Sequence, residues 1–292
     1  MENPPNLRTA VLHRFKPDFS WPWSSKSAPP PSCAVPGYGT GSCIETSSCV
    51  GSYRYYSGYC PGAANIKCCI QSNNPIPTPS TVPVSSWGLD LYAYTSVSTF
   101  ACMANAGKSY LILRGFRSTG LPDTNACLNA RNAVAAGYKP KSIDVYIFPC
   151  PLCASTPAQQ ISDLMAAMRQ CSSSWSGRVW LDIEGGGQYW SKSFKTNYAF
   201  FTGLVDACKA QVGNCGVYSN ADEWSSVLGS VAKTYSKAVA LPVWYPRYLY
   251  NQSPSLSDFT PFGGWTKPYA KQYVGDATVC GVDVDLNYAP KW

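Results

Sequence analysis

The cysteines of this 292-residue chain constrain its fold more than any other feature. There are fourteen, and they fall into two even sets, six before residue 84 and eight after it. Two separate disulfide frameworks require an even number in each set, and such a density indicates an oxidising compartment. We expect every cysteine to be paired, although the spacing leaves the partners open. The first set is Cys33, Cys43, Cys49, Cys60, Cys68 and Cys69, and the second is Cys102, Cys127, Cys150, Cys153, Cys171, Cys208, Cys215 and Cys280.

Histidine is almost missing, and this excludes several kinds of chemistry. The one histidine, His13, lies near the start of the chain, and the cysteine spacings do not form two close pairs at the interval of a zinc finger. Serine or cysteine triads with a histidine base are excluded for the same reason. The glycines at 185–187 are not followed by lysine, so they do not form a phosphate-binding loop. We expect carboxylate chemistry, with neither a metal nor a cofactor.

The composition changes along the chain and predicts its domain organisation. Residues 1–31 are polar and end in consecutive prolines, which predicts a disordered leader. Residues 32–71 hold the first cysteine set among Gly, Ser and Tyr, and predict a small disulfide-rich module. Residues 72–86 contain four prolines and no charge, as an extended linker would. Residues 87–292 predict one large domain, which we expect to be catalytic.

The start of the chain conflicts with the cysteines. It lacks the uninterrupted apolar stretch of a signal peptide, and no window elsewhere is long and apolar enough to span a membrane. The cysteines nevertheless indicate export. We therefore expect a secreted or phagolysosomal protein whose natural start differs from Met1, or which is exported by another route.

From residue 87 onward, short apolar strands alternate with helical patterns. Helical periodicity covers 123–137 and 156–170, and the second stretch begins with Thr156 as N-cap, Pro157 in the first turn and Gln159 in the capping-box position. This alternation predicts an α/β fold, closed as a TIM-like (β/α) barrel rather than a doubly wound sheet. The later helical patterns are weak, so we expect an irregular barrel. The expected strands are 87–92, 110–116, 143–149, 178–184, 214–220, 240–245, 269–274 and 282–287.

Charge and aromatic content narrow the classes of partner. The formal charge is +7, from 23 Lys and Arg against 16 Asp and Glu, and no basic run argues for nucleic acid. The chain has ten Trp and twenty Tyr. This excess favours a carbohydrate ligand, because sugar rings stack on flat side chains while their hydroxyls bond to polar tips. A tyrosine-rich core explains part of the excess.

The stretch VWLDIEGGGQYW, residues 179–190, places two acids in an apolar strand. Side chains alternate along a strand, so Asp182 and Glu184 share one face. Asp90 and Asp285 end the first and last expected strands, which become neighbours when a barrel closes. Chemistry in such barrels lies at the C-terminal ends of strands, so we expect the four carboxylates to meet there and to serve glycoside hydrolysis. For any one of them alone, a solvated acid or a helix cap is the simpler interpretation.

From residue 87 to 292 the sequence resembles the family 25 glycoside hydrolases, most closely the lysozymes of amoebae, nematodes and some fungi. The motifs that carry the resemblance are GLDLY (88–92), DVYIFPCPLC (144–153), VWLDIEGGGQYW (179–190), CGVYSN (215–220), PFGGW (261–265), KQYVGD (271–276) and CGVDVDLNYAP (280–290). The resemblance implies an irregular β/α barrel that cleaves the β-1,4 bond between N-acetylmuramic acid and N-acetylglucosamine in peptidoglycan. It implies Glu184 as general acid/base and Asp182 as the acid that assists the substrate acetamido group. Asp90 and Asp285 would shape the subsite.

The spacing of the acids leaves the stereochemistry open, since both retention and inversion fit two carboxylates two residues apart on a strand. The resemblance favours retention, with the substrate N-acetyl oxygen as nucleophile. We expect Asp182 and partial burial to raise the pKa of Glu184, which predicts a mildly acidic optimum. The expected sugar-binding residues are Tyr146, Tyr189, Trp190, Tyr218, Trp244, Tyr245, Gln272 and Tyr273.

Two other functions stay open from the sequence. One is a chitinase-like hydrolase with substrate assistance, although such enzymes carry further acids upstream of the acid pair, where this chain has none. The other is an inactive carbohydrate-binding protein, which would not need an acid with a raised pKa. The module at 32–71 resembles cysteine-rich modules joined to fungal wall-degrading enzymes, so we expect it to bind cell wall; a pro-segment or a stabilising cap is the alternative. We expect a monomer.

Overall fold

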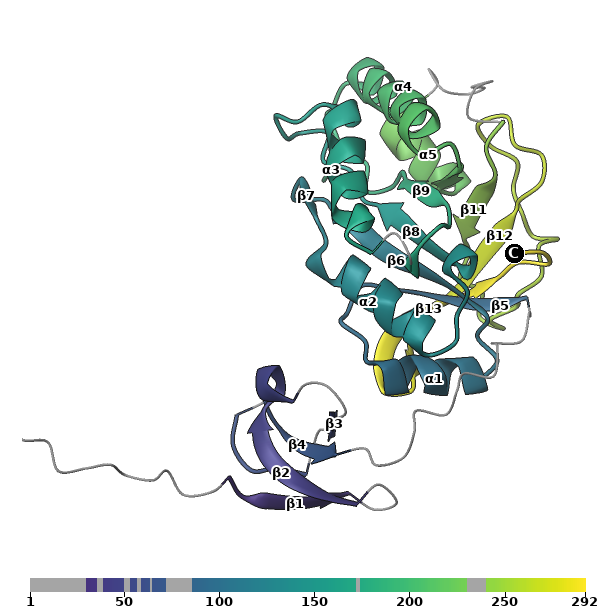
Figure 1. Cartoon of the computed structure of the whole chain (residues 1–292). Helices are drawn as coiled ribbons and strands as arrows, with labels where there is room; N and C mark the ends of the chain where they lie inside the picture. The colour runs from purple at the N-terminus through teal and green to yellow at the C-terminus, as the bar shows by residue number, and fades with distance from the viewer. Residues whose placement is uncertain are drawn as a thin grey trace, which may run out of the picture. The chain divides into compact units, whose positions relative to one another are not determined.

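The computed structural model describes residues 30–35, 39–49, 53–56, 59–63, 65–71, 86–171, 174–229 and 240–292. The chain divides into two compact units, Met1–Pro75 and Ile76–Trp292, each described by itself below (Figure 1). The predicted leader up to residue 29 and the predicted linker from 72 to 85 lie outside the described residues. The domain boundaries therefore stay predictions.

The first unit is a small antiparallel sheet with the strand order β1-β2-β4-β3. Its apolar core is little more than Val35, Ile70 and buried cysteine sulfurs, which is too small to stabilise a fold alone. Three disulfides supply the missing stability: Cys33–Cys68, Cys43–Cys60 and Cys49–Cys69. The elements are β1 (Ser32–Val35), β2 (Gly39–Glu45), the short helix η1 (Thr46–Ser48), β3 (Tyr53–Tyr56) and β4 (Ile66–Gln71).

The second unit is a closed barrel of eight strands. Neighbouring strands pair in the order β5-β13-β12-β11-β10-β9-β8-β6, and a pairing between β6 and β5 closes the ring. All these pairings are parallel except those of β13, which runs antiparallel to both β12 and β5. The strands are β5 (Trp87–Leu91), β6 (Tyr110–Arg117), β8 (Ile143–Ile147), β9 (Val179–Asp182), β10 (Cys215–Tyr218), β11 (Val243–Pro246), β12 (Ala270–Val279) and β13 (Val282–Tyr288), with the short β7 (Leu121–Pro122) beside β6.

Helices cover the outside of the parallel part of the barrel (Figure 1). In each of the α-helices the side chain of the N-cap residue accepts a hydrogen bond from a backbone N–H of the first turn, which satisfies a donor that the helix cannot. The described helices are α1 (Val97–Asn105), α2 (Thr124–Ala135), the short η2 (Pro140–Ser142), α3 (Pro157–Arg169), α4 (Phe194–Gln211) and α5 (Ala221–Leu228). None of them is long and apolar enough to cross a membrane.

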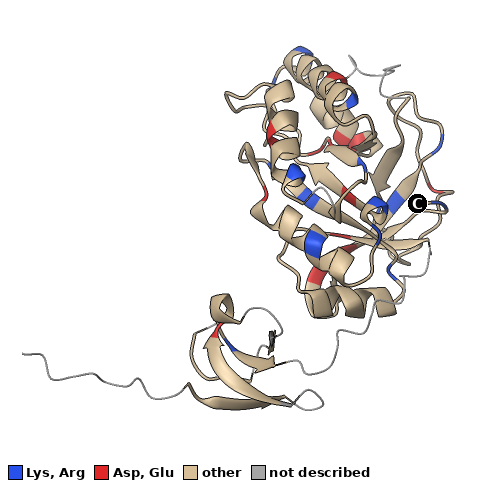
Figure 2. Ribbon diagram, viewed as in Figure 1, with Lys and Arg blue, Asp and Glu red and all other residues tan. Residues whose placement is uncertain are grey.

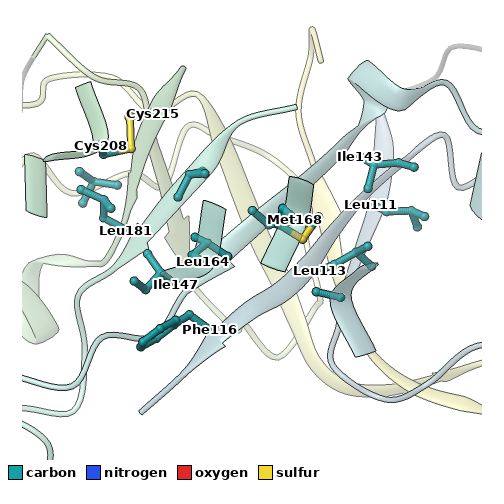
Figure 3. Packing of buried hydrophobic residues seen from close by; sticks show 14 of the residues in the cluster. Leu111, Leu113, Phe116, Ile143, Ile147, Leu164, Met168, Leu181, Cys208 and Cys215 are labelled. Atoms are coloured by element: carbon teal, nitrogen blue, oxygen red, sulfur yellow. A yellow bond between two sulfur atoms is a disulfide. The ribbon is translucent and has the colours of Figure 1, made fainter. Parts of the chain in front are cut away.

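The main core lies between the strands and these helices. Figure 3 shows Leu113, Ile147 and Leu181 from the strands near Leu164 and Met168 of α3. A second, aromatic cluster fills the barrel interior, where Trp292 stacks on Tyr110 with ring centroids 3.7 Å apart. The inside of the barrel is thus packed, and the chemistry is left to its rim.

The predicted α/β barrel and its eight strands are confirmed, with differences in three details. The last strand was expected among parallel strands but is antiparallel. The later helices were expected to be weak, but α4 is the longest helix described, at 18 residues. The side chain of Gln159 binds Asp163 at 2.7 Å rather than closing a capping box, although Thr156 caps α3 as predicted.

All fourteen cysteines form disulfides, and every disulfide stays within its own set, as the even counts predicted. In the barrel, Cys102–Cys280 ties α1 to the turn between β12 and β13 and spans 178 residues of sequence. The remaining three link residues that are closer in sequence: Cys127–Cys171, Cys150–Cys153 and Cys208–Cys215.

Candidate active site

The four predicted acids come from three strands of the barrel, of which β5 and β13 are neighbours and β9 is not. Asp182 is the last residue of β9 and Glu184 follows two residues later, while Leu181 and Ile183 point into the outer core. Asp90 lies on β5 directly opposite Asp285 of β13. Asp285 therefore reaches the site from the middle of an antiparallel strand, and not from the C-terminal end of a parallel one.

A buried glutamine joins two of these acids. Gln272, on β12, is 2% exposed, and its Nε2 donates to Asp90 Oδ1 at 2.8 Å and to Asp285 Oδ2 at 2.9 Å. Its Oε1 accepts from the hydroxyls of Tyr218 at 2.7 Å and Tyr248 at 2.5 Å. Gln272 was expected to contact sugar directly, but the structure places it beneath the acids, where it fixes their orientation.

Asp90 accepts a hydrogen bond from a second amide: Asn287 Nδ2 donates to Asp90 Oδ1 at 2.7 Å. Burial and the charge of Asp285 nonetheless raise the pKa of Asp90 well above its ordinary value. Two amides that donate to one carboxylate oxygen hold it in a single orientation. Asp90 can accept hydrogen bonds there but has little freedom to move.

Asp182 is different, because it is buried without a complete set of partners. It is 4% exposed, and its Oδ1 has no hydrogen-bond partner within the described part of the chain. Burial raises the pKa of Asp182 well above its ordinary value, and the charges of Glu184, Asp90 and Glu223 raise it further. A buried acceptor left unpaired is destabilising, so this oxygen, two residues before the pocket-lining Glu184, has an unused capacity to accept a hydrogen bond.

Glu184 is partly exposed at the pocket. Burial, with the charges of Glu223 and Asp285, raises the pKa of Glu184 to about 7. We expected burial and Asp182 to be the causes; burial is the largest, but the acting charges come from Glu223 and Asp285. A carboxyl group with this pKa is half protonated near neutral pH and can both give and take a proton.

A pocket of about 490 Å³ is lined by Glu184, whereas Asp182, Asp90 and Asp285 are not among its lining residues. The lining combines the acidic side chains of Glu184, Glu223 and Asp222 with five aromatic side chains, called the aromatic wall below. Aromatic rings together with polar groups suit a sugar ring. The aromatic residues of the wall are Tyr218, Tyr245, Tyr248, Phe259 and Phe262.

Of the expected sugar-binding residues, Tyr218 and Tyr245 line this pocket and the others do not. Tyr189 lies just after β9 and packs edge-on against Phe148. Tyr146 is half-buried against the aromatic cluster inside the barrel. The remaining side chains are in the core: Trp190 at 3%, Trp244 at 2% and Tyr273 at 8% exposed.

Three residues of the site were missed in the sequence. Asn287 lies two residues after Asp285, so strand alternation alone would have placed it on the same face. Tyr248 and Glu223 each follow the C-terminal end of a barrel strand, β11 and β10, which is where barrel chemistry is expected. Position after a strand is thus the signal that would have found Tyr248 and Glu223, and strand alternation the one for Asn287.

A closed α/β barrel with buried carboxylates beside a sugar-sized pocket defines a glycoside hydrolase. Residues 82–273 match the family described as Lysozyme-like protein 1 (Lys-1). The chain belongs to this lysozyme-like family, and so to the family 25 lysozymes.

Individual relatives agree with this assignment. The chain is 37% identical over 203 residues to "Probable GH family 25 lysozyme 2" of Dictyostelium discoideum, a match that covers 70% of this chain and 90% of the relative. It is also 37% identical over 214 residues to "Lysozyme-like protein 5" of Caenorhabditis elegans, covering 72% and 94%. The bacterial lysozyme of Streptomyces coelicolor shares the fold, with a TM-score of 0.54 at 21% identity, over 70% of this chain and 92% of that one.

Proposed function

We propose that this protein hydrolyses the β-1,4 bond between N-acetylmuramic acid and N-acetylglucosamine in bacterial peptidoglycan. Glu184 is the general acid and base of the reaction. Asp182 assists the N-acetyl group of the substrate, and the anomeric configuration is retained. The kinship with family 25 lysozymes supports the class of reaction, and the pairing of Asp182 with Glu184 supports the roles.

The observation that carries the roles is the unpartnered Oδ1 of Asp182. An acetamido N–H is the donor that this buried oxygen lacks, and the sugars on both sides of the scissile bond carry one. A hydrogen bond to Asp182 orients the acetamido group and increases the nucleophilicity of its carbonyl oxygen. The same bond removes the desolvation penalty of the unpaired acceptor, so substrate binding and nucleophile activation coincide.

The reaction proceeds in two displacements. Protonated Glu184 gives its proton to the glycosidic oxygen as the bond from that oxygen to the anomeric carbon breaks, and the acetamido oxygen bonds to the anomeric carbon from the opposite face. This bond closes an oxazolinium ring, and Asp182 stabilises its positive charge. Glu184, now ionised, takes a proton from a water molecule as the water attacks the anomeric carbon. The attack opens the oxazolinium ring and restores the original configuration.

The proposed role of Glu184 is tested by Glu184→Gln, which keeps the shape of the side chain but removes the proton. The variant is expected to clear a suspension of bacterial cells at least about a hundredfold more slowly than wild type, because general acid catalysis is lost. Asp163→Asn, on the exposed surface of α3, serves as the matched control and should clear at the wild-type rate. A Glu184→Gln variant that remains fully active would contradict the proposal.

The stereochemistry is tested by NMR of the freshly released products. Retention releases the β-anomer first, and the α-anomer then accumulates by mutarotation. Initial release of the α-anomer would exclude the substrate-assisted route. Turnover of chitin at a rate equal to that of peptidoglycan would favour the chitinase-like alternative.

The seven disulfides are consistent with an oxidising compartment. We extend the proposal to a monomer that acts on peptidoglycan outside the cell or in the phagolysosome. Gel filtration and fractionation of the producing cells test these two points.

A further inference from the structure

Glu223 occupies a fixed position at the start of α5. The side chain of Asn220 caps this helix, and its Oδ1 accepts from the backbone N–H groups of Asp222 at 3.0 Å and Glu223 at 2.9 Å. Trp224, the next residue, is buried against Phe201 of α4 and Trp265. The backbone that carries Glu223 is therefore held both by its cap and by the core.

The side chain of Glu223 reaches the residue next to the proposed acid. Its Oε2 accepts from the backbone N–H of Gly185 at 2.8 Å. The carbonyl of the same peptide unit, which belongs to Glu184, accepts from Trp190 Nε1 at 2.8 Å. The peptide bond between Glu184 and Gly185 is thus held from both sides, by a carboxylate at its N–H and an indole at its oxygen.

The glycines that follow make this arrangement possible. Gly185 has φ +73°, a conformation that favours glycine. A Cβ on Gly186 would lie 2.6 Å from the backbone of Ser226 on α5, so the loop packs directly on this helix. The sequence had indicated that these glycines let a polymer approach; the structure gives two of them the role of bringing the loop against α5.

We propose that Glu223 is a positioning residue for Glu184: it holds the peptide bond after the acid in place and keeps a negative charge in the same pocket. This inference rests on the proposed role of Glu184 as the general acid. The contact of Glu223 is with the backbone beside the acid, and nothing in the proposed reaction requires it to bond to the substrate.

The charge of Glu223 also acts on the pKa of Glu184. Burial is the largest cause that raises this pKa to about 7, and the charge of Glu223 is the second largest. Without this charge the pKa of Glu184 falls, and the acid loses its proton at a lower pH. Other groups at the pocket or acting on its acids would stay in place. They are Asp222 of α5, Asp285 of β13, Asp182 of β9, Asp90 of β5, Tyr218 of β10, and Tyr245, Arg247 and Tyr248 of β11 and the loop that follows it.

The test is the pH dependence of kcat/KM on bacterial walls for Glu223→Gln and Glu223→Ala. Glutamine keeps an oxygen that can accept from Gly185 but removes the charge. We expect the alkaline limb of the kcat/KM profile of Glu223→Gln to move about one pH unit toward acid, while the plateau of this profile stays within a few-fold of wild type. Alanine removes both the oxygen and the charge. The alkaline limb of Glu223→Ala should therefore move as far as that of Glu223→Gln. The plateau of Glu223→Ala should fall about tenfold further, because the peptide unit between Glu184 and Gly185 loses one of its two hydrogen bonds.

Asp163→Asn is the charge control, because it removes a carboxylate from α3, outside the residues that line the pocket. The charges that raise the pKa of Glu184 do not include that of Asp163, so the alkaline limb of this variant should stay in place. A Glu223→Gln profile that superimposes on wild type, with Glu184→Gln inactive, overturns this inference and leaves the proposed function standing. An active Glu184→Gln overturns the proposed function instead.

Hydrogen exchange of the unmodified chain tests the hold of Glu223 on the Gly185 amide even where a variant does not fold. The Gly185 amide, bonded to the carboxylate of Glu223 in a loop that packs on α5 through Gly186, should exchange its hydrogen with solvent at least about a hundredfold more slowly than an exposed loop amide. Exchange at the rate of an exposed amide would overturn the inference.

Discussion

Asp182 is the residue whose position is least favourable for folding. Its carboxyl group is buried, one oxygen lacks a partner, and like charges surround it. A side chain in this state is retained for what it does to a ligand and not for what it adds to stability. The proposed function therefore predicts that activity and stability oppose each other at this position.

The prediction is made for Asp182→Asn as a function of pH. Unfolded aspartate has a pKa of about 3.9, and burial raises the pKa of folded Asp182 well above that value. Between the two, the folded protein holds a proton that the unfolded chain has lost, so the free energy of unfolding falls as pH rises. Asparagine has no proton to lose. The variant should be inactive, and at pH 7 more stable than wild type by about 1–3 kcal/mol.

The measurement is thermal or urea unfolding of both proteins at pH 4 and pH 7. The gain in stability should be small at pH 4, where the unfolded chain still holds nearly half of the proton and the folded state holds most of it, and should grow toward pH 7. An equal difference at the two pH values would show that Asp182 is not strained by its charge. Asp163→Asn, on the surface, should show no such growth.

Individual site residues could be predicted from the sequence where their role follows from the alternation of side chains along a strand. Asp182 and Glu184 could be found because they stand two residues apart after an apolar strand. Glu223 could not, because its contact with Gly185 exists only once the glycine loop packs on α5. Trp190 was misleading for a related reason. An aromatic residue near an acid pair suggests stacking on a sugar, whereas the indole of Trp190 donates a hydrogen bond to the carbonyl oxygen of Glu184.

Among the elements, the loop between β11 and β12 depends on one buried lysine. Lys271, on β12, is fully buried, and its Nζ donates to the carbonyl of Ser253 at 2.8 Å and to Asp258 Oδ2 at 2.6 Å. Asp258 in turn accepts from the hydroxyl of Tyr245 at 2.6 Å. Burial alone would raise the pKa of Asp258, but hydrogen bonds from Lys271 and Tyr245 outweigh it and lower the pKa. This loop carries part of the aromatic wall of the pocket.

We therefore predict that Lys271→Met releases the loop. Removal of one partner of a buried pair leaves the other uncompensated, which destabilises by about 3–5 kcal/mol at most, since Asp258 keeps other partners. The released loop should be cut by protease within residues 249–257, and KM should rise more than kcat falls. Lys267→Met, at an exposed position just before β12, is the control and should resist protease like wild type. Equal resistance of both variants would contradict the role given to Lys271.

The elements also show where sequence patterns fail. The barrel strands could be located because each is a short apolar run bounded by turns. Helix α4 was overlooked because FKTNYAFFTGLVDACKAQ is rich in aromatic residues and contains Gly203, both unfavourable to helices. Packing overrides this: Phe201, Leu204 and Val205 are fully buried, and a Cβ on Gly203 would lie 3.0 Å from Pro157 at the start of α3. The reversed direction of β13 likewise depends on its hairpin with β12, which the strand patterns do not show.

For the whole molecule, stability is organised as two independent frameworks. The disulfides of the first unit and those of the barrel have no cysteine in common and none joins the two. Lys and Arg are spread over several elements in Figure 2 and are not gathered on one of them. The segment shared with the D. discoideum relative makes up 90% of that relative and 70% of this chain.

The two units raise the question of what the first one adds to the barrel. The resemblance of the module to those of wall-degrading enzymes predicts that it binds cell wall. Binding through a tether raises the local concentration of the barrel on an insoluble polymer but does nothing for a soluble fragment. The two substrates therefore separate a targeting role from a stabilising one.

The experiment compares the full chain with the chain Ile76–Trp292. On soluble muropeptide fragments the two should have the same kcat/KM, whereas on insoluble walls at low enzyme concentration the shorter chain should be slower by roughly tenfold or more. A stabilising cap predicts something else, namely a lower melting temperature of the shorter chain and an equal loss on both substrates. Equal activity and equal stability on every measure would leave the module without either role, and would show that wall recognition belongs to the barrel alone.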